Sequence, residues 1–333
     1  MKKNFFSYEN LGGEYVPLGN DLRLGVPTAV FGVSEPHKYL TAALCRGSLL
    51  YVTADGISAR RAAQSLSALT GEEAVLLTPK DDVLLYKEAI SREALFARLT
   101  AADKIYSGAR IVVCDAEAAL QLFPARPVAL VLRTGDDFDY ANLPAQLVSM
   151  GYNREYEVEA KGSFAVRGDI LDIFPVNCEN PVRIDFFGDT VEKIRPYDAV
   201  SGERLKEAGE VRIISAAEAF VAESDLPAIK KALSDGLKKF PDVKAFGRAR
   251  AIADELISKA EGGAPFAGAS YLMPVLSSSR TLFDALSPDT TIYFDECKLL
   301  NDRIAGICSE HANRFNELKA GGEAFDFSIN QLL

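Results

Sequence analysis

Short apolar runs alternate with helical patterns in the first third of the chain, and this alternation limits the possible folds most strongly. Continuous apolar runs of five to eight residues are typical of strands that are buried on both faces of a parallel sheet. Strand, helix, strand, helix predicts an α/β domain made of βαβ units. The predicted strands are Val26–Val33, Leu49–Thr53, Ala74–Thr78 and Arg110–Cys114.

The pattern changes between residues 136 and 212. Charged and apolar residues alternate there, first at Glu155–Glu159, and glycines separate the runs. Such alternation predicts a half-buried antiparallel meander with tight turns, and a helical stretch at Leu143–Met150 makes it a small α+β unit. The four phenylalanines of this part are predicted to lie in its core, and Gly168 is predicted to mark a bulge or a close backbone approach within a strand. The strands are expected in Phe164–Phe174, Val182–Phe187 and Thr190–Arg195, and the phenylalanines are Phe164, Phe174, Phe186 and Phe187.

Helical stripes return after residue 213, with one short apolar strand at Thr291–Phe294. We therefore predict three segments, 1–125, 126–212 and 213–333. A strand-rich insert between two α/β stretches suggests that the first and third segments form one discontinuous domain.

Composition excludes several classes of protein. The 333 residues carry 37 basic and 47 acidic side chains, a net charge of −10, which disfavours non-specific binding to duplex DNA. The five cysteines include no C-x-x-C pair and the two histidines lie far apart, so no metal site is expected. With no apolar run long enough for a membrane span and no secretion signal, we expect a cytoplasmic protein without a membrane contact.

The segment after the first predicted strand partly matches the phosphate-binding pattern G-x-x-x-x-G-K-[ST]. Gly32 and Lys38 fall in register. However, Pro36 has no N–H to offer a phosphate, His37 replaces a glycine, and Tyr39 replaces the hydroxyl residue that would bind Mg²⁺. We therefore expect no nucleotide binding at this loop.

Asp295 and Glu296 follow an apolar strand, where a carboxylate pair holding Mg²⁺ would lie in an ATPase. Gly32, Lys38, Asp295 and Glu296 are interpreted as remnants of a nucleotide site. Only 37 residues follow Glu296, too few for a second motor lobe of about 100–200 residues. We expect no catalytic residue and no cofactor, with ATP and Mg²⁺ needed only in motor domains that these residues do not include.

The middle segment resembles the domain shared by the nucleotide excision repair protein UvrB and the transcription-repair coupling factors (Mfd). The decayed phosphate loop, and the lack of a tyrosine-rich hairpin in residues 79–110, are similar to the N-terminal UvrB-like module of the coupling factors rather than to UvrB. The resemblance is carried by Leu147–Arg154, Gly162–Pro175, Pro181–Asp189 and Val191–Asp198, and weakly by Tyr271–Leu276 and Thr281–Leu286.

This resemblance implies a degenerate RecA-like, P-loop-type parallel-sheet domain with an inserted antiparallel α+β domain. It also implies a non-catalytic role, the recruitment of UvrA to stalled RNA polymerase, and a UvrA-binding patch that contains Arg154, Arg167 and Arg183. Ala165 stands where UvrB has a further arginine. The family's longer chains bind RNA polymerase and double-stranded DNA through other domains, and this module packs against their motor and masks its UvrA-binding face. These residues would then be an N-terminal fragment.

Two other hypotheses stay open at this point. The chain could be a UvrB-like, ATP-dependent repair helicase domain with residual nucleotide binding at Lys38, Asp295 and Glu296. It could also be an α/β protein that has lost its binding function, in which the arginines are surface residues paired with nearby acids.

Overall fold

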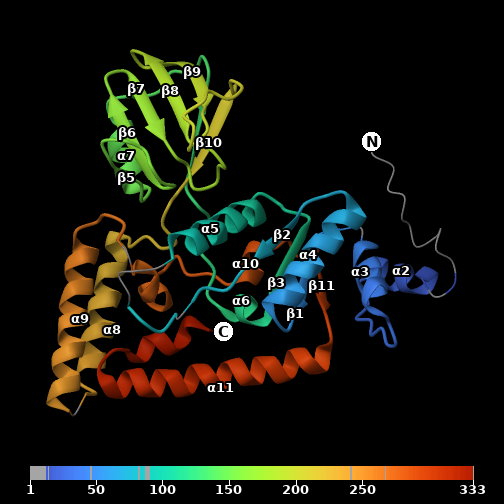
Figure 1. Cartoon of the computed structure of the whole chain (residues 1–333). Coiled ribbons are helices and arrows are strands. Elements are labelled where there is room, and N and C mark those ends of the chain that lie inside the picture. The colour runs from blue at the N-terminus through green and yellow to red at the C-terminus, as the bar shows by residue number, and fades with distance from the viewer. Residues whose placement is uncertain are drawn as a thin grey trace.

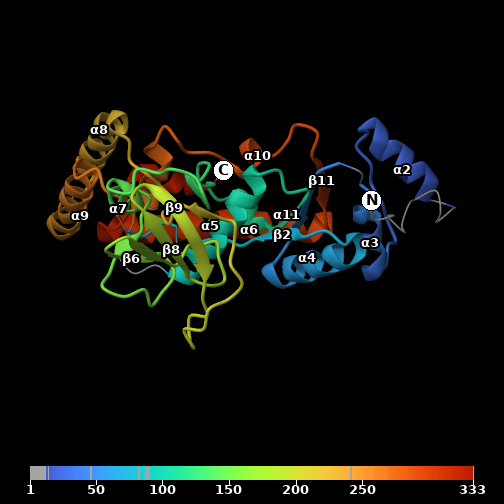
Figure 2. The same ribbon diagram turned by 90° about the horizontal axis from the view of Figure 1, so that it is seen from above.

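The computed structural model describes residues 13, 15–45, 47–81, 83–86, 91–240, 242–266 and 268–332. An α/β body carries a separate antiparallel unit at one side and a helical hairpin at one end (Figure 1). The same arrangement is seen from above in Figure 2, where α11 runs the length of the body.

A four-stranded parallel sheet forms the centre of the body, in the order β11-β1-β3-β2. Strand β11 comes from the last third of the sequence and pairs with β1 from Leu49↔Thr291 to Val52↔Phe294. The two outer segments of the chain therefore share one sheet. The strands are β1 (Leu49–Thr53), β2 (Ala74–Leu77), β3 (Ile111–Asp115) and β11 (Thr291–Phe294).

Helices cover both faces of this sheet. The side chains of α3 and α4 pack with Leu49, Tyr51 and Ile111 on one face, and those of α5, α6 and α11 pack with Leu50, Val52 and their neighbours on the other. Because both faces are covered, β1 and β3 are buried along their whole length, as their apolar runs predict. The helices are α3 (Glu35–Ala43), α4 (Gly56–Thr70), α5 (Arg92–Tyr106), α6 (Ala116–Leu120) and α11 (Cys297–Gly321).

The prediction of a strand at Val26–Val33 is wrong. These residues are an irregular segment between α2 (Tyr15–Leu24) and α3, and Phe31 is 89% exposed. Within the described residues no strand pairs with this segment, and Pro27 could not donate to one. An apolar run becomes a strand only where a neighbour satisfies its backbone, which periodicity does not report.

The antiparallel unit is a five-stranded sheet in the order β5-β6-β7-β8-β9, with α7 (Leu143–Ser149) beside it. A two-stranded ribbon, β4 (Ala129–Arg133) with β10 (Glu210–Ile214), joins it to the body. The strands are β5 (Asn153–Arg154), β6 (Ser163–Arg167), β7 (Ile170–Ile173), β8 (Val182–Phe187) and β9 (Thr190–Pro196).

Two predictions for this unit are wrong in detail. The stretch Phe164–Phe174 is two strands joined by a tight turn, and Gly168 lies in that turn with φ 59° rather than at a bulge. Glycine adopts this left-handed conformation without the steric cost that a Cβ imposes, so it permits the turn. The alternation at Glu155–Glu159 belongs to a loop, because β5 ends at Arg154.

Helix α5 fixes the antiparallel unit to the body. Phe96 and Leu99 of α5 belong to the hydrophobic core of the antiparallel unit, and Thr100 donates to the carbonyl oxygen of Val176 over 3.5 Å. On the same helix Arg98 is 2% exposed and donates to Glu218, in the segment that leaves the antiparallel unit, over 2.9 Å. Lys80 lies 3.2 Å from the same carboxylate. Although burial alone would raise the pKa of Glu218, these two cations lower it and keep the carboxylate charged.

The remaining elements form the helical end of the body. Helices α8 and α9 pack against each other and against η2, with Leu233, Leu256 and Tyr271 among the buried residues. The elements are η1 (Glu223–Asp225), α8 (Leu226–Leu237), α9 (Val243–Glu261), η2 (Ala269–Val275), α10 (Leu282–Ala285) and η3 (Asp326–Gln331).

Candidate functional site

One face of the five-stranded sheet carries two of the predicted arginines, Arg167 and Arg183, together with Ala165. Ala165 of β6 pairs with Asp172, Asp172 pairs with Arg183, and Arg183 pairs with Arg195 of β9. Registered partners point to the same side of a sheet, so these four residues form one row across it. The alternate positions Phe164, Ile173 and their neighbours point into the core. We call the side of this sheet opposite its core the outer face; Ala165 and Asp172 are buried on it, at 2% and 5% exposed.

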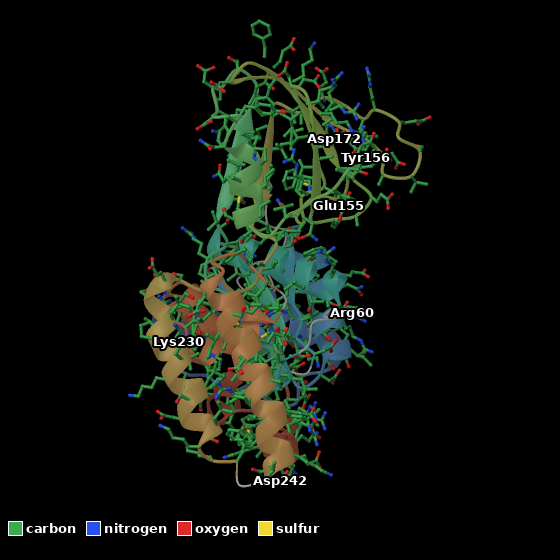
Figure 3. All side chains as sticks on the ribbon, turned by 90° about the vertical axis from the view of Figure 1, so that its left-hand side faces the viewer. Arg60, Glu155, Tyr156, Asp172, Lys230 and Asp242 are labelled. Atoms are coloured by element: carbon green, nitrogen blue, oxygen red, sulfur yellow. The ribbon has the colours of Figure 1, made fainter. Side chains whose placement is uncertain are left out.

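Arg167 lies at the end of β6 and is oriented by the loop that follows β5. Its guanidinium carbon is 5.2 Å from the centre of the Tyr156 ring, and its Nη2 donates to the Tyr156 carbonyl oxygen over 2.8 Å. Tyr156 is 89% exposed and lies at the surface of the antiparallel unit, near Glu155 and Asp172 (Figure 3). An exposed tyrosine stacked with an arginine is typical of the residues that contribute most to protein interfaces.

Arg154 lies on β5, the strand beside β6, so the two predicted arginines occupy neighbouring strands. The register pairs Arg154 with Phe164, which points into the core. Arg167 is three residues after Phe164 on β6, so its side chain points to the other face of the sheet. Arg154 therefore lies on the opposite side of the pleat from Arg167, at the same edge of the sheet. Burial raises the pKa of Tyr140, and the positive charge of Arg154 opposes that rise only in part.

Arg183 is held by a partner within the sheet. Its Nε and Nη2 donate to the two carboxylate oxygens of Asp172 over 2.7 and 2.8 Å, and its guanidinium carbon lies 5.9 Å from the Tyr197 ring centre. These hydrogen bonds, which Asp172 accepts, raise the pKa of Arg183. Two donor nitrogens are thus used internally, Nη1 has no hydrogen bond to Asp172, and the side chain is 40% exposed.

The prediction that Phe187 lies in the core is wrong. Phe164, Phe174 and Phe186 are buried as predicted, but Phe187 is 81% exposed. It is the last residue of β8 and shares the outer face with Arg183 and Asp185. The signal was present: adjacent residues of a strand point to opposite faces, so Phe186 and Phe187 could not both enter one core.

The predicted nucleotide remnants come together only in part. Lys38 Nζ on α3 lies 2.8 Å from Asp295 Oδ2 at the end of β11, with side chains 13% and 7% exposed. Gly32, in contrast, is in the exposed segment before α3, and no strand of the described chain runs into it. The ammonium group of Lys38 thus contacts directly the carboxylate that would hold a metal ion in an ATPase.

Aromatic side chains pack beside this ion pair. Tyr51 and Tyr293 stack with ring centres 4.8 Å apart, and Tyr39 lies 6.0 Å from Tyr51. Burial raises the pKa of Tyr51, and the charge of Asp295 raises it further. Glu296 is exposed and adopts φ 51°, the left-handed conformation, where a non-glycine side chain is strained. We call Lys38, Asp295 and these tyrosines the remnant corner.

Other classes of site are not found in the described part of the chain. No group of three or more His, Cys, Asp and Glu side chains is placed to hold a metal ion there. None of the helices in the described ranges combines the length and the apolar character that crossing a bilayer requires.

Comparison with known proteins bears directly on the outer face. The family profile of the UvrB interaction domain matches residues 130–219, which include all of the antiparallel unit's five-stranded sheet. The transcription-repair-coupling factor of Myxococcus xanthus is 31% identical over 297 residues, covering 81% of this chain and 23% of that protein. The chain is homologous to the transcription-repair-coupling factors.

Further relatives agree. The transcription-repair-coupling factor of Bacillus subtilis is 26% identical over 286 residues, which cover 83% of this chain and 24% of that protein. The UvrABC system protein B of Methanococcoides burtonii is 29% identical over 137 residues, 40% of this chain and 21% of that protein. The chain spans about a quarter of the length of the coupling factors that it matches.

Proposed function

We propose that the chain is a UvrA-binding module of a transcription-repair-coupling factor and that the outer face is its binding surface. The observation that carries this proposal is the exposed Tyr156–Arg167 stack, with Phe187 on the same sheet, within the UvrB interaction domain. Exposed aromatic and arginine side chains supply large contact area and bidentate donors for carboxylates. Arg154 extends the patch around the edge of the sheet, and Arg183 contributes its remaining nitrogen.

The module would have no catalytic activity and no cofactor of its own. The contact between Lys38 and Asp295 supports this part of the proposal, because the lysine and carboxylate of an ATPase must be available to phosphate and Mg²⁺. The alternative, a UvrB-like ATP-dependent repair helicase domain, requires that contact to open. Equilibrium titration with Mg·ATP tests it: we expect no saturable binding, and binding that Lys38→Ala abolishes would favour the alternative.

The biological setting is part of the same proposal. Recruitment of UvrA would serve transcription-coupled nucleotide excision repair in the bacterial cytoplasm, at RNA polymerase stalled on damaged DNA. RNA polymerase and double-stranded DNA would be bound by other parts of a longer protein. The motor of that protein would pack against this module and cover the outer face until the motor engages.

Titration of the chain with the cognate UvrA at fixed salt tests the central proposal. We expect saturable binding by the wild type and at least a tenfold loss of affinity in Arg154→Ala/Arg167→Ala. Arg250→Ala is the matched control, since Arg250 is an exposed arginine on α9 with an acidic partner, Asp254, on its own helix. Equal losses in both variants, or no binding by the folded wild type, would overturn the proposal.

A further inference from the structure

A groove of about 650 Å³ lies beside β2, away from the outer face and the remnant corner. One wall is formed by β2 and α5, and the other by the antiparallel unit at Ala160, Lys161 and Val176. Its volume falls within the range of roughly 300–1,000 Å³ that is usual for ligand pockets. The lining is mostly apolar and includes Leu76, Phe96 and Ala97.

The groove runs along a free strand edge. Strand β2 is the last strand in the order β11-β1-β3-β2, and in the part of the chain that the structure describes no strand pairs with its outer side. The N–H of Ala74 is satisfied by the Ser67 hydroxyl over 2.9 Å. The rest of the edge offers backbone N–H and C=O groups with which an added strand can pair.

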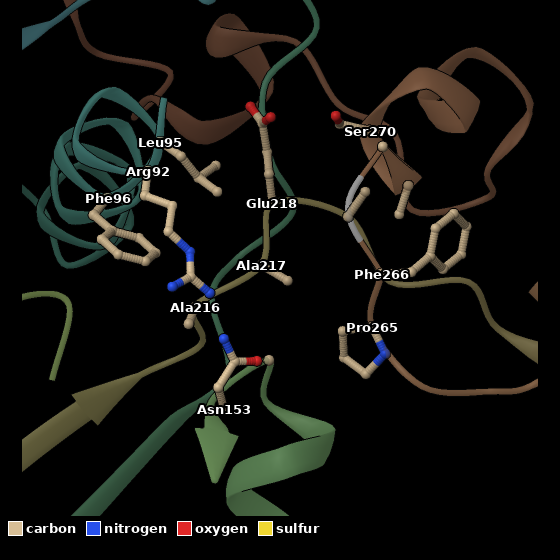
Figure 4. A pocket seen from close by; sticks show the side chains of 14 residues that line it. Arg92, Leu95, Phe96, Asn153, Ala216, Ala217, Glu218, Pro265, Phe266 and Ser270 are labelled. Carbon is tan, nitrogen blue, oxygen red and sulfur yellow. The ribbon is translucent and has the colours of Figure 1, made fainter. Parts of the chain in front are cut away.

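The rim of the groove carries cations without an acidic partner. Arg92 and Lys161 line it and form no ion pair among the described residues, whereas Lys104 is paired with Glu73. The guanidinium of Arg92 turns toward the amide of Asn153 in an adjoining cavity, beside Ala216 and Ala217 (Figure 4). Glu93 is the acidic residue of the rim without a partner in the described chain. The rim is therefore locally positive on a chain whose net charge is −10.

We propose that this groove binds an extended peptide with acidic residues, which adds to the outer edge of β2. Main-chain hydrogen bonds to β2 would supply affinity, and alternate side chains would enter the apolar groove or reach the rim. Lys161 Nζ lies 5.7 Å from the centre of the Phe174 ring, and neither Lys161 nor Arg92 has a carboxylate partner among the described residues, so these two cations would select acidic residues at positions that face the rim. Single-stranded nucleic acid fits less well, because a sugar-phosphate backbone cannot form the alternating main-chain hydrogen bonds that the edge of β2 offers.

Fluorescence anisotropy with a labelled hexapeptide of alternating Glu and Val tests the proposal. Three competitors separate the possible causes of binding: the same peptide with alternate amides N-methylated, a Lys/Val peptide of equal length, and a thymidine hexanucleotide. We expect the Glu/Val peptide to bind at least tenfold more tightly than each of them. Equal binding by the N-methylated or Lys/Val peptide, tighter binding by the oligonucleotide, or no binding would overturn the proposal.

Charge reversal locates the site. Arg92→Glu/Lys161→Glu is expected to weaken binding of the Glu/Val peptide at least tenfold and to improve binding of the Lys/Val peptide. Arg60→Glu is the control, because Arg60 is exposed on α4, on the other face of the sheet. Unchanged affinity in the double variant, with a native circular dichroism spectrum, would contradict the assignment to this groove. UvrA titration of the same variant should match the wild type, so this proposal and the proposed function can fail independently.

Discussion

The outer face and the remnant corner use similar side chains and differ in what these side chains can reach. In the remnant corner, the Lys38 side chain is 13% exposed and forms an ion pair with Asp295. On the outer face, Tyr156 and Phe187 are at least 81% exposed, and Arg167 rests against an aromatic ring and a carbonyl oxygen rather than against a carboxylate. A cation with an internal carboxylate contributes to the fold, and one without remains available to a partner. A motif identifies the residue type but not which of these two conditions holds.

The largest effect on stability is expected when the carboxylate of the remnant corner is removed. Asp295→Ala leaves the Lys38 ammonium buried and unpaired, so we expect a loss of about 3–5 kcal/mol of unfolding free energy in urea melts. Lys38→Met/Asp295→Leu should recover most of this loss, since no buried charge remains. Asp254→Ala is the control, because the exposed Arg250–Asp254 pair should contribute no more than about 0.5 kcal/mol. Equal losses in Asp295→Ala and Asp254→Ala would show that burial does not separate the two pairs.

The next largest effect is expected at Phe187. Phe187→Ala should weaken UvrA binding by about 2 kcal/mol, close to 30-fold, because a central aromatic anchor of an interface contributes on this scale. Its free energy of unfolding should change by less than about 0.5 kcal/mol, as for other exposed positions. Phe186→Ala, one residue away and buried, should instead lower stability. A destabilised Phe187→Ala with normal UvrA affinity would assign that side chain to the fold.

A smaller effect sharpens the distinction within the outer face itself. Arg183→Ala leaves the buried carboxylate of Asp172 without its bidentate partner, so we expect about 1 kcal/mol of destabilisation in thermal melts. Arg154→Ala should leave stability unchanged within about 0.5 kcal/mol, because no carboxylate of the described residues pairs with it. Equal melting temperatures for the two variants would mean that the Asp172–Arg183 pair contributes nothing measurable.

The smallest effect is expected in the reactivity of the cysteine thiols. Burial raises the pKa of Cys45, in the core beside the remnant corner, to about 11, so at pH 8 this thiol is protonated and inaccessible. Ellman's reagent should react quickly with the exposed Cys297 and Cys308 and slowly with Cys45. Asp295→Ala should accelerate the reaction of Cys45, and an unchanged rate in that variant would place the thiol outside the region that the ion pair holds closed.

Much of the architecture could be predicted from the sequence because local pattern determines it. The apolar run at Leu49–Thr53 is the fully buried strand β1, and the run at Arg110–Cys114 gave the fully buried strand β3 one residue later, at Ile111–Asp115. The alternation at Val182–Phe187 became a strand with one buried face. The failure at the first predicted strand has a different cause, because strand formation there depends on neighbours distant in sequence. Val26–Val33 has strand composition but no pairing partner among the described residues.

The candidate site was predictable in type and less so in arrangement. Arg154 and Arg167 lie on neighbouring strands, as predicted. Strand pairing, which the sequence does not report, places them on opposite sides of the sheet. It also brings Asp172 to Arg183. Phe187 could have been found from strand periodicity alone. The ion pair between Lys38 and Asp295 spans 257 positions in the sequence, a separation at which no local pattern predicts a contact.

Hydrogen–deuterium exchange of the chain, alone and saturated with cognate UvrA, tests the central claim most directly. We expect slower exchange in β5, in the loop that follows it, and in β6 and the end of β8, where Arg154, Tyr156, Arg167 and Phe187 lie. Exchange in α3 and β11, which carry the remnant corner, should stay unchanged. Protection confined to α3 and β11, with none along the outer face, would show that UvrA does not bind at the outer face.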